Sequence, residues 1–151
     1  MVQTELKALL VAAGDAEKAN VFGVDVEFLI RNEQTGGVFS AYKCTAQPGT
    51  GAPPHLHLRE EETFYVIEGE FEVLHGDEKS IVKAGGTVLL PRNIPHAFTN
   101  CGTTPAVLIG FATPGGHENF FIDAARLDTG GPIDMDAARA VCAKHGITLL
   151  I

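Results

Sequence analysis

The sequence contains no tryptophan, only three cysteines among 151 residues, and no cluster of lysine and arginine. Cys44, Cys101 and Cys142 are far apart, odd in number and without a CxxC spacing, so they predict neither a disulfide framework nor a zinc knuckle. The formal net charge is -8, whereas a protein that binds nucleic acid needs a basic surface to offset the phosphates. Nucleic acids and anionic membranes are therefore not expected as partners.

The sequence also lacks long apolar runs: no stretch approaches the length that a transmembrane helix needs. The early run at 6–13 is interrupted by Lys7, which argues against a secretion signal. We therefore expect a cytoplasmic protein. The segment 4–13 has a spacing of apolar residues that fits either a helix or an edge strand.

Glycine and proline are plentiful, at 17 and 8 residues, and they divide the chain into short apolar segments. Strands are predicted at 20–30, 38–46, 63–68, 71–74, 80–83, 87–90, 96–100 and 106–112. The last of these is apolar on both faces, and in the second Val38, Ser40, Tyr42, Cys44 and Ala46 are expected to point inward.

Two helices are expected after the strands, at 118–127 and 135–145. Asp134 is a suitable N-cap for the second helix, and Gly146 follows its end. The order of elements predicts an all-β sandwich or barrel with a C-terminal helical extension. We expect one domain over residues 1–151, with a barrel core at about 20–114 and a helical tail at about 117–151.

A group of histidines and carboxylates offers the donors of a metal site. His55 and His57 are two residues apart, so both imidazoles can point to the same side of a strand. A turn would place Glu62 on the next strand, facing inward, and His96 follows a tight corner later in the chain. Three imidazoles and one carboxylate suit a first-row transition metal such as Fe, Mn, Ni, Co, Cu or Zn, rather than Mg or Ca.

The spacing of these residues resembles the two motifs of the cupin superfamily. Gly49, His55, His57, Glu62 and Gly69 match the first motif, G-x5-H-x-H-x4-E-x6-G. The second motif, G-x5-P-x-G-x2-H-x3-N, is matched by Gly85, Pro91, His96 and Asn100, with Asn93 in place of the usual glycine. Asparagine tolerates the left-handed backbone conformation, so we expect this corner to be retained.

Residues of about 20–121 further resemble the small single-domain cupins that are similar to quercetin 2,3-dioxygenase. The resemblance implies a double-stranded β-helix (jelly-roll) barrel, a metal inside it and a homodimer. It also implies a dioxygenase that acts on a small aromatic or enolic, flavonol-like substrate, with Glu62 as metal ligand and proton acceptor. The side chains expected to contact the substrate are those of Tyr42, Phe64, Phe98 and Asn100.

Two other functions fit the same four donors. A metal-dependent isomerase, epimerase or lyase would polarise a carbonyl group there, and a non-catalytic cupin would only bind a small molecule or a metal.

The remaining histidines, His75, His117 and His145, are predicted to lie in a turn, a loop and a helix end. Glu60 and Glu61 are predicted to be turn and rim residues.

Overall fold

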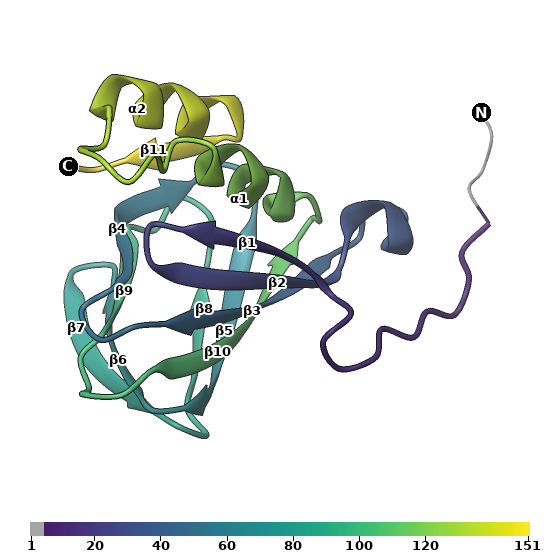
Figure 1. Cartoon of the computed structure of the whole chain (residues 1–151), viewed down its shortest axis with the longest axis horizontal. Helices are drawn as coiled ribbons and strands as arrows, with labels where there is room; N and C mark the ends of the chain where they lie inside the picture. Colours follow the sequence, from purple (N-terminus) through teal and green to yellow (C-terminus); the bar gives the residue numbers. More distant parts are fainter. Residues whose placement is uncertain (1–4) are drawn as a thin grey trace.

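The computed structural model describes residues 5–151, which form two antiparallel β-sheets packed face to face, with helices over one end (Figure 1). The strands are β1 (Glu17–Val21), β2 (Val24–Ile30), β3 (Ser40–Ala46), β4 (Gly51–His57), β5 (Glu61–Glu68), β6 (Glu70–His75), β7 (Glu78–Lys83), β8 (Thr87–Leu90), β9 (His96–Asn100), β10 (Ala106–Thr113) and β11 (Ile147–Leu149). The helices are the short 3-10 helix η1 (Asn32–Thr35), α1 (His117–Ala125) and α2 (Met135–Lys144).

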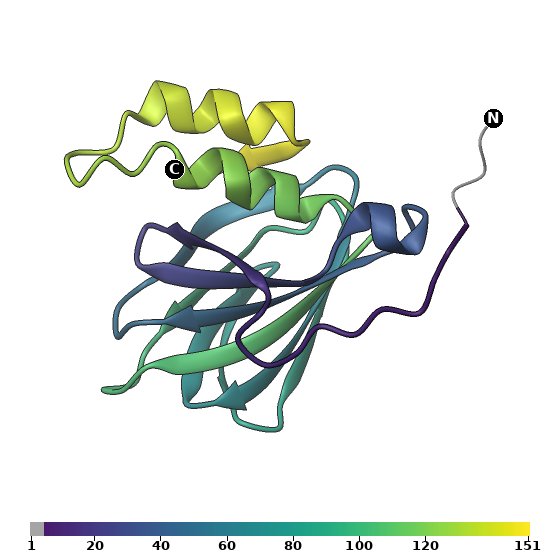
Figure 2. The same ribbon diagram turned by 45° about the vertical axis from the view of Figure 1, so that its right-hand side comes forward.

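One sheet has six strands in the order β1-β2-β3-β10-β5-β8, and the other has five in the order β11-β4-β9-β6-β7. Strands that follow one another in the chain often lie in opposite sheets, as β4 and β5 do. This arrangement is the predicted double-stranded β-helix. Figure 2 shows the two sheets curving around a common interior, with the helices above it.

Every second side chain along the strands points into this interior and fills it. In β3 the side chains of Tyr42, Cys44 and Ala46 are buried, as predicted, and they join Phe64, Val66 and Leu108 from the neighbouring strands. The prediction for Val38 was wrong, because the strand begins only at Ser40 and Val38 is exposed.

Two residues with a left-handed backbone conformation form corners between strands. Gly69 has φ +75° between β5 and β6, and a side chain there would collide with Ala106. Asn93 has φ +65° and its N–H donates to the carbonyl oxygen of His57 at 2.7 Å. The expectation that asparagine would keep this corner is therefore confirmed.

The C-terminal tail covers the open end of the barrel (Figure 1). The carboxylate of Asp134 accepts hydrogen bonds from the N–H groups of Asp136 and Ala137, which confirms it as the N-cap of α2. After α2 the chain returns as β11, which pairs with β4 from Ile147 opposite His57 to Leu149 opposite His55. The tail is thus anchored beside the two histidines.

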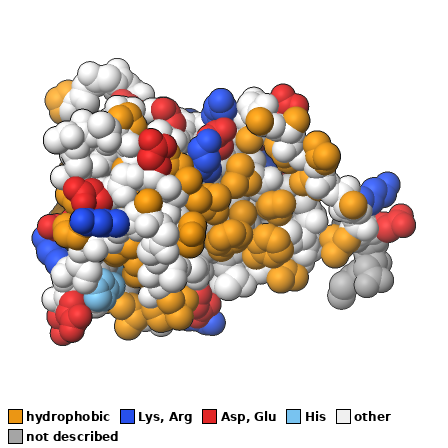
Figure 3. Space-filling view, turned by 90° about the horizontal axis from the view of Figure 1, so that it is seen from below, with side chains coloured by type: hydrophobic (Ala, Val, Ile, Leu, Met, Phe, Trp, Pro, Cys, Tyr) orange, Lys and Arg blue, Asp and Glu red, His pale blue; other side chains and the backbone are white. Residues whose placement is uncertain are grey.

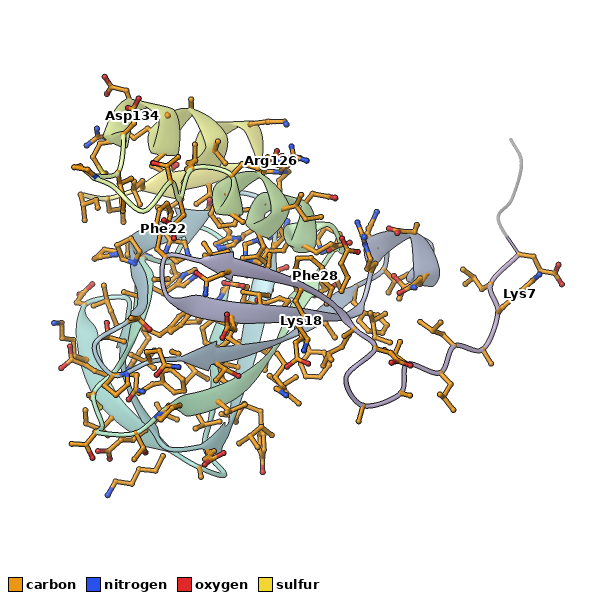
Figure 4. The ribbon with its side chains drawn as sticks, in the orientation of Figure 1. Lys7, Lys18, Phe22, Phe28, Arg126 and Asp134 are labelled. Atoms are coloured by element: carbon orange, nitrogen blue, oxygen red, sulfur yellow. The ribbon has the colours of Figure 1, made fainter. Side chains whose placement is uncertain are left out.

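The N-terminal segment differs from both predicted alternatives. Residues 5–13 form neither a helix nor a strand and extend away from the barrel, while residue 4 lies outside the described residues. Figure 4 shows Lys7 well away from the two sheets. Among residues 5–151, no helix is long and apolar enough to cross a membrane.

Candidate metal centre and cavity

Four of the predicted site residues meet inside the barrel. His55 and His57 come from β4, His96 from β9 and Glu62 from β5 of the opposite sheet. One potential ligand atom from each lies within 4.8 Å of those from the other three. Because β4 and β9 pair with His55 opposite His96, the two motifs meet through backbone hydrogen bonding between their strands.

Each of the three imidazoles has its Nδ1 atom beside an oxygen that accepts hydrogen bonds. The partners are the carbonyl oxygen of Pro53 for His55 (2.7 Å), that of Ile94 for His96 (3.0 Å), and Oε2 of Glu60 for His57 (3.2 Å). Since carbonyl and carboxylate oxygens only accept, Nδ1 must carry the proton. Nε2 of each neutral ring then presents a lone pair, as a metal ligand requires.

These lone pairs face a carboxylate. Oε2 of Glu62 lies 3.0 Å from Nε2 of His96 and 3.3 Å from Nε2 of His57. The Nε2 atom of His57 is buried and has no hydrogen-bond partner. Electron-pair donors that converge on one point are stabilised by a cation, so this cluster can hold a metal ion.

Glu60 is part of the site, in contrast to the prediction that it lies at a turn or rim. Its side chain is buried and its carboxylate holds Nδ1 of His57. Glu61, the next residue, points outward and pairs with Arg92 at 2.5 Å, as expected of a rim residue. The three consecutive glutamates 60, 61 and 62 therefore have three different surroundings.

His117 is a second site residue that the sequence did not reveal. The prediction of a loop residue was wrong: His117 begins α1, is buried, and places Nε2 3.4 Å from Oε1 of Glu62. The hydroxyl group of Tyr42 donates to the same Oε1 atom. One oxygen of Glu62 thus faces the histidine cluster, while Tyr42 and His117 contact the other.

Burial and charge set the protonation of these groups. Burial lowers the pKa of His55 to about 4 and that of His117 to about 3, so both are neutral at pH 7. Burial acts to raise the pKa of Glu62, but the neighbouring His117, His57 and His96 outweigh it and hold this pKa well below its ordinary value. Glu62 is therefore an ionised carboxylate, and His55 and His117 beside it are neutral.

A cavity of about 210 Å³ leads from this cluster to the space between the barrel and the C-terminal tail. The predicted residues Tyr42, Phe64 and Phe98 line it, as does Cys44. Burial raises the pKa of the Cys44 thiol, so it is neutral at pH 7. The opposite wall comes from the tail, including Phe121, and Phe22 in the β1–β2 turn lies beneath the helices (Figure 4).

Asn100 does not line this cavity, in contrast to its predicted role in contacting the substrate. Its amide nitrogen donates to the carbonyl oxygens of Ala46 (2.9 Å) and Thr104 (2.8 Å), and its side-chain oxygen accepts from the N–H of Gly102 (2.9 Å). The bonds to Thr104 and Gly102 hold the turn after β9, and the bond to Ala46 joins this turn to the end of β3. Its motif position reflects a structural requirement of the barrel.

Comparison with known proteins agrees with this architecture. Residues 42–111 match the family described as "Cupin domain". Protein SchB from Streptomyces halstedii is 33% identical over 108 residues, which cover 70% of this chain and 78% of SchB. Oxalate oxidase GF-3.8 from Triticum aestivum is 32% identical over 113 residues, which cover 69% of this chain and 50% of that protein.

Solved structures share the fold at lower sequence identity. The structure of KdgF from Halomonas sp. superposes with a TM-score of 0.67 at 18% identity, over 75% of this chain and 99% of KdgF. At this level of identity the likeness concerns the fold alone.

Proposed function

The chain belongs to the cupin superfamily, and from that premise we propose that it is a metal-dependent dioxygenase acting on a small aromatic or enolic substrate of the flavonol type. The observation that carries the proposal is the contrast between the two ends of the cavity. One end holds the donors of His55, Glu62 and His117, and the remaining wall is almost entirely apolar.

The cavity also argues against small anionic substrates. Among the described residues, none of those lining it is a lysine or an arginine. The match to an oxalate oxidase supports oxidative chemistry, but oxalate is a dianion and would have no fixed cation from the protein in this cavity. An uncharged ring fits the apolar wall of the cavity, and an ionisable hydroxyl group on that ring fits the end that holds the histidines and Glu62.

A divalent first-row metal held by His55, His57, Glu62 and His96 would supply Lewis-acid and redox chemistry. Glu62 would accept the proton of the substrate hydroxyl group, because its carboxylate is ionised and reaches the cavity. Tyr42 and His117, both beside Oε1, would keep the carboxylate oriented during this transfer.

The rings of Phe64 and Phe98 would hold the substrate ring. They meet edge to face with centroids 5.3 Å apart and line the cavity together. The apolar wall would also exclude water from the reacting atoms.

The proposal is tested by oxygen consumption. Protein stripped with a chelator is loaded separately with Mn, Fe, Co, Ni, Cu or Zn and mixed with a panel of flavonols and catechols, with oxalate as the anionic comparison. We expect uptake of O2 with at least one metal and an aromatic substrate, and none with oxalate. The His57→Ala variant, which lacks one donor, should bind metal weakly and consume no O2.

Absence of O2 uptake with every metal and substrate would refute the dioxygenase. Turnover without O2 would instead indicate an isomerase, epimerase or lyase, and a ligand recovered unchanged would indicate a binding protein. Equal metal content in His57→Ala and the unmodified protein would refute the metal site itself.

A further inference from the structure

The hairpin between β1 and β2 turns through only two residues, Phe22 and Gly23. Val21 pairs with Val24 across the turn, and φ is +50° at Phe22 and +89° at Gly23. A positive φ at both central positions is characteristic of a type I′ turn, in which asparagine or aspartate before glycine is the favoured sequence. Glycine suits its position, but phenylalanine in the first position places a bulky side chain on a backbone conformation that such residues rarely adopt.

This backbone conformation distinguishes Phe22 from other apolar residues near the surface. Hydrophobic side chains also gather on the face turned away from the helical tail, so partial exposure alone has no special meaning (Figure 3). Among residues 5–151, the non-glycine residues with a positive φ are Phe22 and Asn93. Asparagine tolerates this conformation, whereas phenylalanine is strained in it. Such strain persists where the surrounding structure enforces it, and it is concentrated at functional sites.

Contacts on both sides hold the tip of this hairpin. The N–H of Gly23 donates to Oδ1 of Asn20 at 3.2 Å, and Nδ2 of Asn20 donates to the carboxylate of Asp25 at 2.8 Å. Thr50, in the loop before β4, packs so closely on Gly23 that an added Cβ atom would lie 2.9 Å from its methyl group. The backbone of the turn is therefore fixed, and it determines the direction in which the ring of Phe22 points.

The ring of Phe22 lies at the outer end of the cavity. Glu62 and His117 line the inner end and are buried, whereas two other lining residues, Ile133 and Ile151, are 43% and 57% exposed. The exposed lining residues mark the end at which the cavity meets solvent. Phe22 is half-buried, lines the same cavity and lies just below the C-terminal tail (Figure 4).

The cavity thus has aromatic side chains at both ends. Phe64 and Phe98 lie with their rings 5.3 Å apart in the buried part, and Phe22 lies near solvent. A flavonol consists of a hydroxyl-bearing ring system and a phenyl ring joined by a single bond. With the hydroxyl group at Glu62, the phenyl ring would extend toward the outer end. Catechol, with one ring, would stay at the inner end.

We propose that Phe22 is a specificity-determining residue, whose ring packs on the distal ring of a two-ring substrate. The strained turn is kept because a favoured asparagine could not make this contact. This role rests on the proposed function, which supplies the aromatic substrate. It adds a preference for substrates with two ring systems over substrates with one.

The experiment measures binding without turnover. Galangin, a flavonol with an unsubstituted phenyl ring, and catechol are each titrated calorimetrically into metal-free and Zn²⁺-loaded protein in the absence of O2. In Phe22→Asn the dissociation constant of galangin should rise about two- to tenfold, the size of one aromatic contact, and that of catechol should change less than about twofold. Phe22→Tyr keeps the ring and should bind both molecules as the unmodified protein does.

Thermal melting separates this role from ordinary packing. Asparagine is favoured in the first position of a type I′ turn, so Phe22→Asn should melt at the same temperature as the unmodified protein or higher, although the ring is lost. The matched control is Phe111→Asn, the same change at a side chain 44% exposed on β10 that does not line the cavity. This control should melt at a lower temperature, because asparagine is disfavoured in strands, and should leave both dissociation constants unchanged.

Galangin binding that is equal in Phe22→Asn and Phe111→Asn overturns the role of Phe22. Equal losses of galangin and catechol binding overturn the preference for two rings. A lower melting temperature in Phe22→Asn also overturns the proposal, because the phenylalanine would then be kept for the stability of the fold.

Failure of the proposed function gives different results. If the unmodified protein binds no galangin, the proposed substrate class is refuted, and the role of Phe22 with it. If only the dioxygenase is wrong, O2 uptake is absent while the expected pattern of galangin and catechol binding is retained, which supports the role of Phe22.

Discussion

Replacing Glu60 with glutamine should weaken metal binding, although Glu60 is not one of the four clustered donors. Its Oε2 atom lies 3.2 Å from Nδ1 of His57, and its side chain is buried. The carboxylate holds the ring so that Nε2 faces Glu62, and its charge makes the imidazole a stronger donor. Glutamine keeps the size and an acceptor oxygen but removes the charge.

The size of the effect follows from this contact. Loss of a hydrogen-bonded partner behind a metal-ligating histidine typically lowers affinity about 10–100-fold, or about 1.4–2.8 kcal/mol. A separation of 3.2 Å is at the long end of N–H···O distances, and glutamine can still accept the bond. We therefore expect a loss near the lower limit, about tenfold.

The neighbouring residue supplies the control. Glu61→Gln makes the same chemical change one position away, but Glu61 faces outward and pairs with Arg92. This ion pair lies at the surface, where solvent screens it, and it does not contact the histidines. Zn²⁺ affinity of both variants would be measured by competition with a chromogenic chelator at neutral pH.

Equal affinities in Glu60→Gln and Glu61→Gln would refute the reasoning, because they would show that the buried carboxylate does not act on His57. A loss in Glu60→Gln that accompanies partial unfolding would be recognised from the circular dichroism spectrum of the metal-free variant. In that event Glu60→Asp, which keeps the charge, should have the circular dichroism spectrum of the unmodified protein. Its affinity for Zn²⁺ should still be lower than that of the unmodified protein.

Two further predictions concern stability. In metal-free protein, His55 and His117 have folded-state pKa values of about 4 and about 3 against 6.5 when unfolded, so the unfolded chain binds more protons below pH 6.5. The free energy of unfolding should therefore fall as the pH drops from about 6.5 towards 3. The raised pKa of His57 acts in the opposite direction and offsets part of this loss. A melting temperature that rises as the pH drops over this range would contradict the prediction. Asn100→Ala should lower the free energy of unfolding by about 2–4 kcal/mol, because buried backbone groups lose their partner. Urea unfolding measures this, and unchanged stability combined with altered substrate binding would restore the role first predicted for Asn100.

The sequence was sufficient for the features that depend on local spacing. The two-residue period of a strand places His55 and His57 on one side, and the histidine–glutamate spacing with its glycine and proline corners predicted which four donors meet. Asn93 adopts the left-handed backbone expected from its side chain. Alternation along β3 also identified Tyr42 and Cys44 as inward-facing.

Other features depended on packing between elements distant in the sequence. The cupin motif identified the position of Asn100, but it did not show which groups its side chain contacts. Those groups lie at Ala46 and in the turn after β9, and the fold brings them to Asn100. Glu60 lies in a run of glutamates that looks solvated, and only the position of β4 relative to the next strand turns it toward His57. No local pattern distinguishes it from Glu61.

The sequence by itself thus determined the fold class and four clustered donors, because strand periodicity and turn chemistry act over a few residues. The tertiary structure alone decided that His117 joins them, because α1 must fold back over the barrel end before Nε2 can approach Glu62. It also decided that β10 keeps one apolar face in the core and the other at the surface. Both outcomes depend on where an element packs, which hydrophobic pattern alone does not specify.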